Sequence, residues 1–192
     1  NAARYPLFCG VDADSVLERD SLRRVARPYE DDPSTIAAGG TVRIANGCEV
    51  NGGFLVGVGL PSNALALFQI VEYLRGFLFG RVGWDAVNAL LILSGTFSLF
   101  LKQAVREAGG FRVGNVSEDM EMIVRLHRHR RRQGKPYRIR FISDPICWTE
   151  VPESMRMLAR QRRRWHLGLI QSIVQNREML FDPRCGRIGM LV

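Results

Sequence analysis

Two acidic pairs and one arginine-rich segment have the residue types best suited to chemistry. Asp12 and Asp14 lie two residues apart, directly after the apolar run 7–11. Alternate residues of an extended chain point to the same side, so both carboxylates face one space. Hard oxygen ligands of this kind suit Mg²⁺ or Mn²⁺, which can bridge to substrate phosphates. An isolated Asp-x-Asp is also common in solvated turns and is a weak signal by itself.

The second acidic pair, Glu118 and Asp119, lies where a helix is expected to begin. Acidic residues are ordinary at that position because the helix dipole favours them. The functional interpretation makes one of them a general base that removes a proton from an attacking hydroxyl. The pair alone leaves both interpretations open.

The segment Gln161-Arg162-Arg163-Arg164-Trp165 is less ordinary. Together with Arg156 and Arg160 it places five arginines within nine residues. A guanidinium group matches phosphate oxygens in bidentate fashion, and an indole stacks on the apolar face of a sugar ring. A solvated basic helix face, or a patch for membranes or nucleic acid, is the competing interpretation.

A second basic block covers residues 125–140 and includes His127 and His129. We interpret it as a solvated helix face and loop. Residues two apart on a helix diverge by about 200°, which argues against a metal shared by the two histidines. His166 has no evident partner and is expected to be structural.

Composition sets the broad class. The chain has 192 residues with 46% hydrophobic and 24% charged, which is typical of one globular domain. A net charge of +8 favours polyanions, anionic lipids or phosphorylated ligands without choosing among them. The four cysteines form no C-x-x-C pair, so a metal finger is excluded and reduced thiols are expected. We expect the chain to be an internal piece of a longer protein, because the chain begins at Asn1 and ends in an apolar run.

Strands alternate with helices, which indicates an α/β protein. Strands are expected at 7–11, 41–44 and 137–142, the last ending at Asp144-Pro145. Residues 90–101 are expected to be strand-like or buried, with an interruption at Ser94-Gly95-Thr96. Helices are expected from Ser15 to Ala26, stopping before Pro28, and then from Leu60, from Lys102 to Gly109, from Ser117 through His129, and from Pro152.

The helix expected after Leu60 is amphipathic, with Glu72, Arg75 and Arg81 on its wet side and Trp84 after it. Its pattern is compatible with a bilayer interface and equally with packing on the domain's own sheet. The apolar face is formed by Leu67, Phe68, Val71, Leu74, Phe77 and Leu78.

In this order the motifs resemble those of the membrane-associated family 2 glycosyltransferases, the group that includes cellulose, chitin, hyaluronan and poly-N-acetylglucosamine synthases. The resemblance covers nearly the whole chain, and the ordered set that ends in Q-x-x-R-W is specific. It rests on Val11-Asp12-Ala13-Asp14-Ser15, Glu72-Tyr73-Leu74-Arg75, Ser94-Gly95-Thr96-Phe97, Gly109-Gly110-Phe111, Ser117-Glu118-Asp119 and Gln161-Arg162-Arg163-Arg164-Trp165.

The resemblance implies a GT-A fold, a single α/β domain with a Rossmann-like nucleotide half, here incomplete at its N-terminus and carrying amphipathic interfacial helices. Residues 1–185 are expected to form the C-terminal portion of the catalytic domain, and residues 186–192 to start a truncated membrane segment. The family also implies the cell membrane as location, with the catalytic domain on the cytoplasmic face.

The implied reaction is a processive, inverting transfer from a UDP-sugar donor to a hydroxyl of a growing polysaccharide acceptor, assisted by Mg²⁺ or Mn²⁺. Asp119 is the implied base, and Asp14 with Asp12 the implied metal ligands. The residues implied for the donor diphosphate are Asp12, Gln161 and Arg164, and those for the acceptor are Trp165, Glu118, Ser94 and Gly95.

Three alternatives remain at this stage. The chain could be a nonprocessive transferase of the same fold, a catalytically dead relative, or a basic module that binds nucleic acid or anionic lipid without catalysis. Nucleic acid is not the expected partner, because Asp12, Asp14 and Asp119 oppose a polyanion. Ser117 departs from the Thr usual in cellulose synthases, and the family's acidic contact to the nucleotide base lies in a preceding segment.

Overall fold

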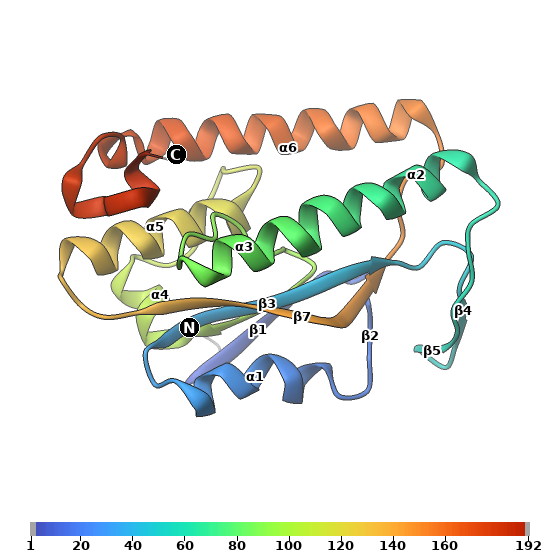
Figure 1. The fold of residues 1–192 in the computed structure, drawn as a ribbon, viewed down its shortest axis with the longest axis horizontal. Coiled ribbons are helices and arrows are strands. Elements are labelled where there is room, and N and C mark those ends of the chain that lie inside the picture. The colour runs from blue at the N-terminus through green and yellow to red at the C-terminus, as the bar shows by residue number, and fades with distance from the viewer. Residues whose placement is uncertain (1–2, 191–192) are drawn as a thin grey trace.

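The computed structural model describes residues 3–190, without the side chains of residues 145, 146, 187 and 190. A five-stranded sheet lies at its centre in the order β1-β6-β3-β7-β2 (Figure 1). Only the β3–β7 pair among these neighbours is parallel. The sheet strands are β1 (Leu7–Val11), β2 (Val16–Leu17), β3 (Thr35–Ile44), β6 (Phe97–Leu101) and β7 (Arg138–Thr149), and a separate hairpin joins β4 (Glu49–Asn51) and β5 (Phe54–Gly57).

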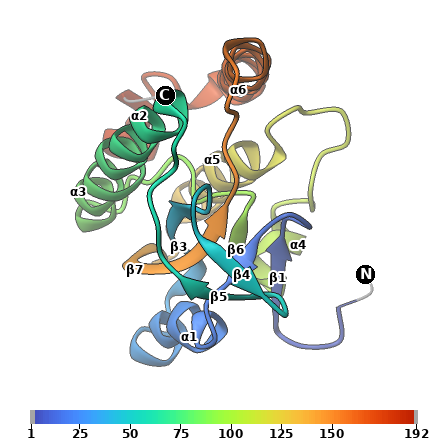
Figure 2. The ribbon, with the colours of Figure 1, turned by 90° about the vertical axis from the view of Figure 1, so that its right-hand side faces the viewer.

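Helices cover both faces of the sheet. Helix α1 (Ser21–Asp31) lies on one face, and the other helices lie on the opposite side, with α6 (Met155–Gln175) outermost (Figures 1 and 2). That side holds α2 (Ala64–Tyr73), a π-helical segment (Leu74–Phe79), α3 (Gly80–Ala86), α4 (Lys102–Glu107) and α5 (Glu118–Arg132), followed by 3₁₀ turns at Arg177–Met179 and Pro183–Met190.

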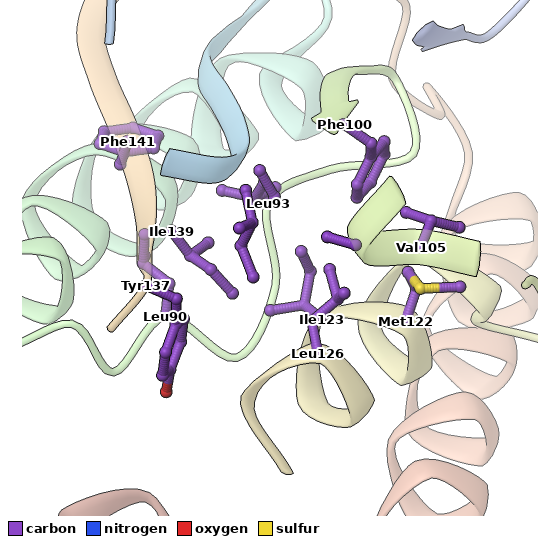
Figure 3. Packing of buried hydrophobic residues seen from close by; sticks show 13 residues of the cluster. Leu90, Leu93, Phe100, Val105, Met122, Ile123, Leu126, Tyr137, Ile139 and Phe141 are labelled. Atoms are coloured by element: carbon purple, nitrogen blue, oxygen red, sulfur yellow. The ribbon is translucent and has the colours of Figure 1, made fainter. Parts of the chain in front are cut away.

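The main apolar core lies between the sheet and helices α4 and α5 (Figure 3). Ile123 and Leu126 of α5 are fully buried against Ile139 of β7. Burying an aliphatic side chain contributes about 1.5–3 kcal/mol, so this packing fixes α5 on the sheet. A second core joins β3 to α1 and α2.

Capping explains where α2 and α6 begin. The side chain of Asn63 accepts hydrogen bonds from the backbone of Leu65 and Ala66 at 2.9 and 3.2 Å. Ser154 accepts one from Met157 at 3.4 Å. These bonds satisfy amide groups that have no partner inside the helix. The N-terminal end of α5 is acidic and its last turn is basic, which matches the helix dipole.

The expected helix from Ser15 to Ala26 is wrong at both ends. Val16 and Leu17 form strand β2 and pair with Trp148 and Cys147 of β7, so sheet pairing overrides the local capping pattern. The helix begins instead at Ser21 and continues past Pro28. The Pro28 carbonyl accepts bonds from the Asp32 amide and the Thr35 hydroxyl, at 3.0 and 2.9 Å, which stabilise this end.

One expected interruption is confirmed and one strand end differs. Residues 90–101 contain strand β6, which follows a bend that carries Ser94 and Gly95, as the interruption expected at Ser94-Gly95-Thr96 requires. The expected stop at Asp144-Pro145 is wrong, since β7 continues to Thr149 with a shifted register against β3. The helix expected after Ser117 is confirmed as α5, although the Ser117 side chain makes no capping bond.

The interpretation of residues 125–140 as a solvated face is wrong for α5. Arg125 and Arg130 are 4% and 8% exposed, and His127 is fully buried. The His127 ring bonds to the Tyr137 hydroxyl and the Leu90 carbonyl, both at 2.7 Å. Leu90 can only accept there, so Nε2 donates to it and Nδ1 accepts from Tyr137.

Residues 183–190 fold back against α5, and Ile188 is buried with Val124 and Met179. Residues 191 and 192 of the expected membrane segment lie outside the described part of the chain. Across residues 3–190, no helix has both the length and the apolar character that crossing a membrane requires.

Candidate active site

Helix α2, the π-helical segment and α3 follow one another directly, and we call residues 64–86 the α2–α3 arm. A cavity of about 220 Å³ lies between the sheet, this arm, α5 and α6. It gathers segments that are far apart along the chain, including three of the residues expected to act together: Ser94, Asp119 and Trp165. The full lining is Val42, Tyr73, Phe77, Arg81, Ile92, Ser94, Thr96, Ser117, Asp119, Met120 and Trp165.

Asp119 is half-buried in the first turn of α5. A Cβ atom built on Gly95 would lie 3.5 Å from Asp119 Oδ2, so the bend at Gly95 lies against this carboxylate. Inside the bend, Ser94 Oγ donates to Thr96 Oγ1 at 2.9 Å, and Ser98 donates to the Ser94 carbonyl. The bend is therefore fixed by its own hydroxyl groups while Asp119 stays open to the cavity.

The end of β1 is joined to the same bend. The Asp12 amide donates to the Thr96 carbonyl at 3.2 Å. Burial raises the pKa of Asp12, the neighbouring carboxylates of Asp14, Asp119 and Glu118 raise it further, and Arg164 opposes them. Asp14, Asp119, Glu118 and Arg164 therefore all act on Asp12.

This crowding of carboxylates fits a divalent cation. Asp12 and Asp14 offer hard oxygen ligands, and a bound cation would relieve the repulsion that raises the pKa of Asp12. Within residues 3–190, no group of three or more His, Cys, Asp or Glu side chains is arranged to hold a metal. Further ligands would have to come from phosphates of a substrate and from water, which is common for Mg²⁺.

Trp165 is held in place from two sides. Its ring lies 6.1 Å from that of Phe77, and the Arg162 guanidinium lies 4.5 Å above it. Arg162 in turn pairs with Glu72 of α2. These contacts connect α6 to the α2–α3 arm and orient the indole toward the cavity.

The remaining expected residues are not part of the cavity wall. The side chains of Asp12, Asp14, Glu118 and Arg164 are exposed. Gln161 is half-buried, and its side-chain oxygen has no hydrogen-bond partner among the described residues.

The sequence missed two features of the site. Arg81, expected on the wet side of its helix, is 5% exposed and lines the cavity. Arg81 follows Phe77 by four residues and therefore shares the apolar face of the helix with it, and this spacing could have predicted its burial. Gly168 was also missed: a Cβ atom there would lie 2.3 Å from the Ser117 Cβ, so only glycine lets α6 approach the start of α5 this closely.

A family model described as glycosyl transferase family group 2 matches residues 8–191. The chain belongs to this family. Among curated relatives, it is 28% identical over 166 residues to the poly-beta-1,6-N-acetyl-D-glucosamine synthase of Staphylococcus aureus and 26% identical to that of Staphylococcus epidermidis. The alignments cover 86% of this chain and 35% of each relative, so the chain spans about a third of their length.

Among solved structures, the mannosyltransferase PcManGT from Pyrobaculum calidifontis, in complex with GDP-Man and Mn²⁺, superimposes with a TM-score of 0.60 at 19% identity. The match covers 97% of this chain and 44% of that structure. At this identity the likeness shows the fold, and it confirms the expected GT-A architecture.

Proposed function

We propose that the protein containing this chain transfers N-acetylglucosamine from a UDP-sugar donor to a hydroxyl of a growing polysaccharide, with inversion at the anomeric carbon and processively. One observation carries the proposal: Asp119 and Trp165 line one cavity beside the carboxylates at the end of β1. The choice of sugar rests on the printed names of the relatives from Staphylococcus.

Asp119 is the base in this proposal. Its carboxylate accepts the proton of the acceptor hydroxyl, whose oxygen forms a bond to the anomeric carbon of the donor. The bond from that carbon to the phosphate oxygen breaks, and the nucleoside diphosphate leaves with the electron pair. A single displacement of this kind inverts the anomeric configuration.

The other residues position the two substrates. Trp165 offers an aromatic face to the acceptor sugar, and Arg164 offers charge and hydrogen-bond donors to the departing diphosphate. Asp12 and Asp14 would hold Mg²⁺ or Mn²⁺, which offsets negative charge on a diphosphate when it is bound. Removal of the metal with EDTA is expected to abolish transfer.

The test uses the full-length enzyme and its Asp119→Asn variant. Polymer synthesis is measured with UDP-N-acetylglucosamine, UDP-glucose and UDP-glucuronate. We expect UDP-N-acetylglucosamine to be preferred and Asp119→Asn to lose about 10²–10⁴-fold in turnover while still binding UDP. Near-normal turnover in this variant rules out the base assignment.

Glu30→Gln is a matched control, because Glu30 is an exposed carboxylate on α1, on the opposite face of the sheet. The Glu30→Gln variant should transfer sugar at the wild-type rate.

Product length, measured by mass spectrometry, separates a processive enzyme from a nonprocessive one, which would add single sugars.

We also propose that the α2–α3 arm rests on the cytoplasmic face of the cell membrane. Phe68, Val71 and Phe79 are 72%, 64% and 73% exposed along this arm, and Trp84 is near its end. The other half of the expected apolar face packs inward, as Phe77 and Leu78 do. An exposed aromatic and aliphatic stripe on a basic protein suits an anionic bilayer surface.

Sedimentation with vesicles tests this location. Vesicles with anionic lipid should retain the enzyme, and the triple variant Phe68→Ser, Val71→Ser, Phe79→Ser should bind them more weakly. Equal binding by both proteins contradicts the assignment of this arm. Steeply salt-dependent binding to DNA in place of vesicles would favour the nucleic-acid alternative.

A further inference from the structure

Arg81 is a buried cation without a hydrogen-bond partner for one of its nitrogens. The residue is 5% exposed, and Nη1 has no hydrogen-bond partner among the described residues. Its guanidinium lies 4.5 Å from the ring centre of Phe77 and 6.0 Å from that of Phe141. Burial lowers the pKa of Arg81 to about 10, and Asp119 and Tyr73 raise it, so the group stays charged at neutral pH.

A buried N–H without a partner destabilises the empty protein. Cation–π contacts to the two rings offset part of this cost but leave the donor unused. Arg81 also lines the cavity that holds Asp119, so its guanidinium group is adjacent to whatever enters that cavity.

The chemistry of the cavity limits its occupant. A guanidinium group only donates, so the occupant must present an acceptor oxygen to Arg81. Val42, Ile92 and Met120 supply an apolar part of the wall, so the same occupant should also present an apolar group. The hydroxyl group of Ser117 is available for the rest of a sugar ring.

Charge argues against a carboxylate in this position. The carboxylate of Asp119 is itself part of the cavity wall, so the cavity already holds a negative charge. An acidic sugar would add another negative charge beside Asp119. A neutral carbonyl oxygen satisfies Arg81 without this repulsion.

We propose that Arg81 selects an N-acetylated acceptor sugar: it donates a hydrogen bond to the acetamido carbonyl oxygen, and the acetamido methyl packs against the wall formed by Val42, Ile92 and Met120. The inference rests on the proposed transfer reaction and adds a specificity-determining residue to it. A ring hydroxyl in the same place could accept the bond but would leave the apolar wall uncovered.

The experiment compares two neutral ligands on two proteins. Binding of β-1,6-linked N-acetylglucosamine oligosaccharides and of β-1,6-linked glucose oligosaccharides is measured on the full-length enzyme and on Arg81→Met, in the presence of UDP. The wild type should prefer the N-acetylated ligand by about 10- to 100-fold, the size expected for a hydrogen bond to a charged group. Arg81→Met should reduce the preference to about threefold or less, with its affinity for UDP unchanged.

An equal preference in wild type and Arg81→Met overturns the inference, as does stronger binding of a glucuronate oligosaccharide. If Arg81→Met fails to fold, as judged by lost UDP binding, Arg81→Lys replaces it. Lysine keeps the charge and loses the planar fork, so the preference should fall but persist; an unchanged preference again overturns the inference. Polymer synthesis by the wild type from UDP-N-acetylglucosamine is measured separately, and its absence refutes the proposed function instead.

Discussion

Helices α5 and α6 are both rich in arginine, yet the protein uses the two sets in opposite ways. On α5, Arg125 pairs with Glu121 at 2.9 Å and donates to the Ala108 and Gly110 carbonyls. Arg130 pairs with Glu107 at 3.2 Å. On α6, Arg160, Arg163 and Arg164 are exposed and form no ion pair within residues 3–190.

The difference follows from what surrounds each helix. α5 packs between the sheet and α6, and its buried arginines pair with Glu121 of the same helix, with Glu107 of α4 and with carbonyls that follow α4. α6 is the outermost layer and contains no Asp or Glu, so Arg162 finds its acid on α2 while other arginines keep their charge free for solvent or a ligand. Partnered arginines here are structural, and the unpartnered ones are available for binding.

The largest effect should come from breaking the buried pair on α5. Arg125→Met leaves the fully buried Glu121 without its nearest cation, although Arg112 remains at 3.3 Å. We expect a loss of about 3–5 kcal/mol in the free energy of unfolding, measured by urea denaturation. The double variant with Glu121→Met should recover part of this loss, and an unchanged midpoint in Arg125→Met would contradict the structural role.

Removing an arginine from α6 should instead affect catalysis. Arg164 acts on Asp12 at the end of β1. As the proposed ligand of the leaving diphosphate, Arg164 should be needed for turnover, and Arg164→Met should lower it by about 10²-fold. Its free energy of unfolding should stay within about 0.5 kcal/mol of the wild type. Arg163→Met is the matched control and should change both quantities little; an equal loss of turnover there would refute a specific role for Arg164.

The contact between the two helices can be tested at Gly168. Gly168→Ala places a Cβ atom against Ser117, next to Asp119, and should cost about 1–3 kcal/mol in unfolding free energy and reduce transfer. Gly83→Ala, in α3, has no atom within 4 Å of the added carbon and should be neutral or slightly stabilising. Similar effects in both variants would mean that the α5–α6 approach is not critical.

Near neutral pH the smallest predicted effect on stability comes from His127 in the buried part of α5, because its contribution appears only on acidification. Burial lowers the pKa of His127 to about 3, below its value of about 6.5 in an unfolded chain. As pH falls from about 6.5 toward 3, the unfolded state binds a proton that the folded state does not, so stability falls by up to about 1.4 kcal/mol per pH unit. His127→Gln should lack this contribution to the pH dependence of the unfolding free energy. If that free energy changes with pH equally in the variant and the wild type, His127 is solvated and not buried.

Sequence reasoning succeeded where a local pattern sufficed. Asp12 follows a strand that ends at Val11, and Asp119 lies in the first turn of a helix, both as expected. It failed where distant partners decided the outcome. Val16 and Leu17 joined β7 instead of a helix, and Arg125 and His127 were buried by elements that no local window contains.

The order and types of the residues, D-x-D, the acid pair and the Q-x-x-R-W segment, were sufficient to indicate the family. Their convergence was decided only by the tertiary structure. The close approach of Gly168 to Ser117 and the ring contact between Phe77 and Trp165 position the walls of the cavity. Arg81 is a buried hydrogen-bond donor in one of these walls. The physical reason is that the surroundings of a charged side chain depend on groups brought near it by packing, which its own neighbours in sequence do not specify.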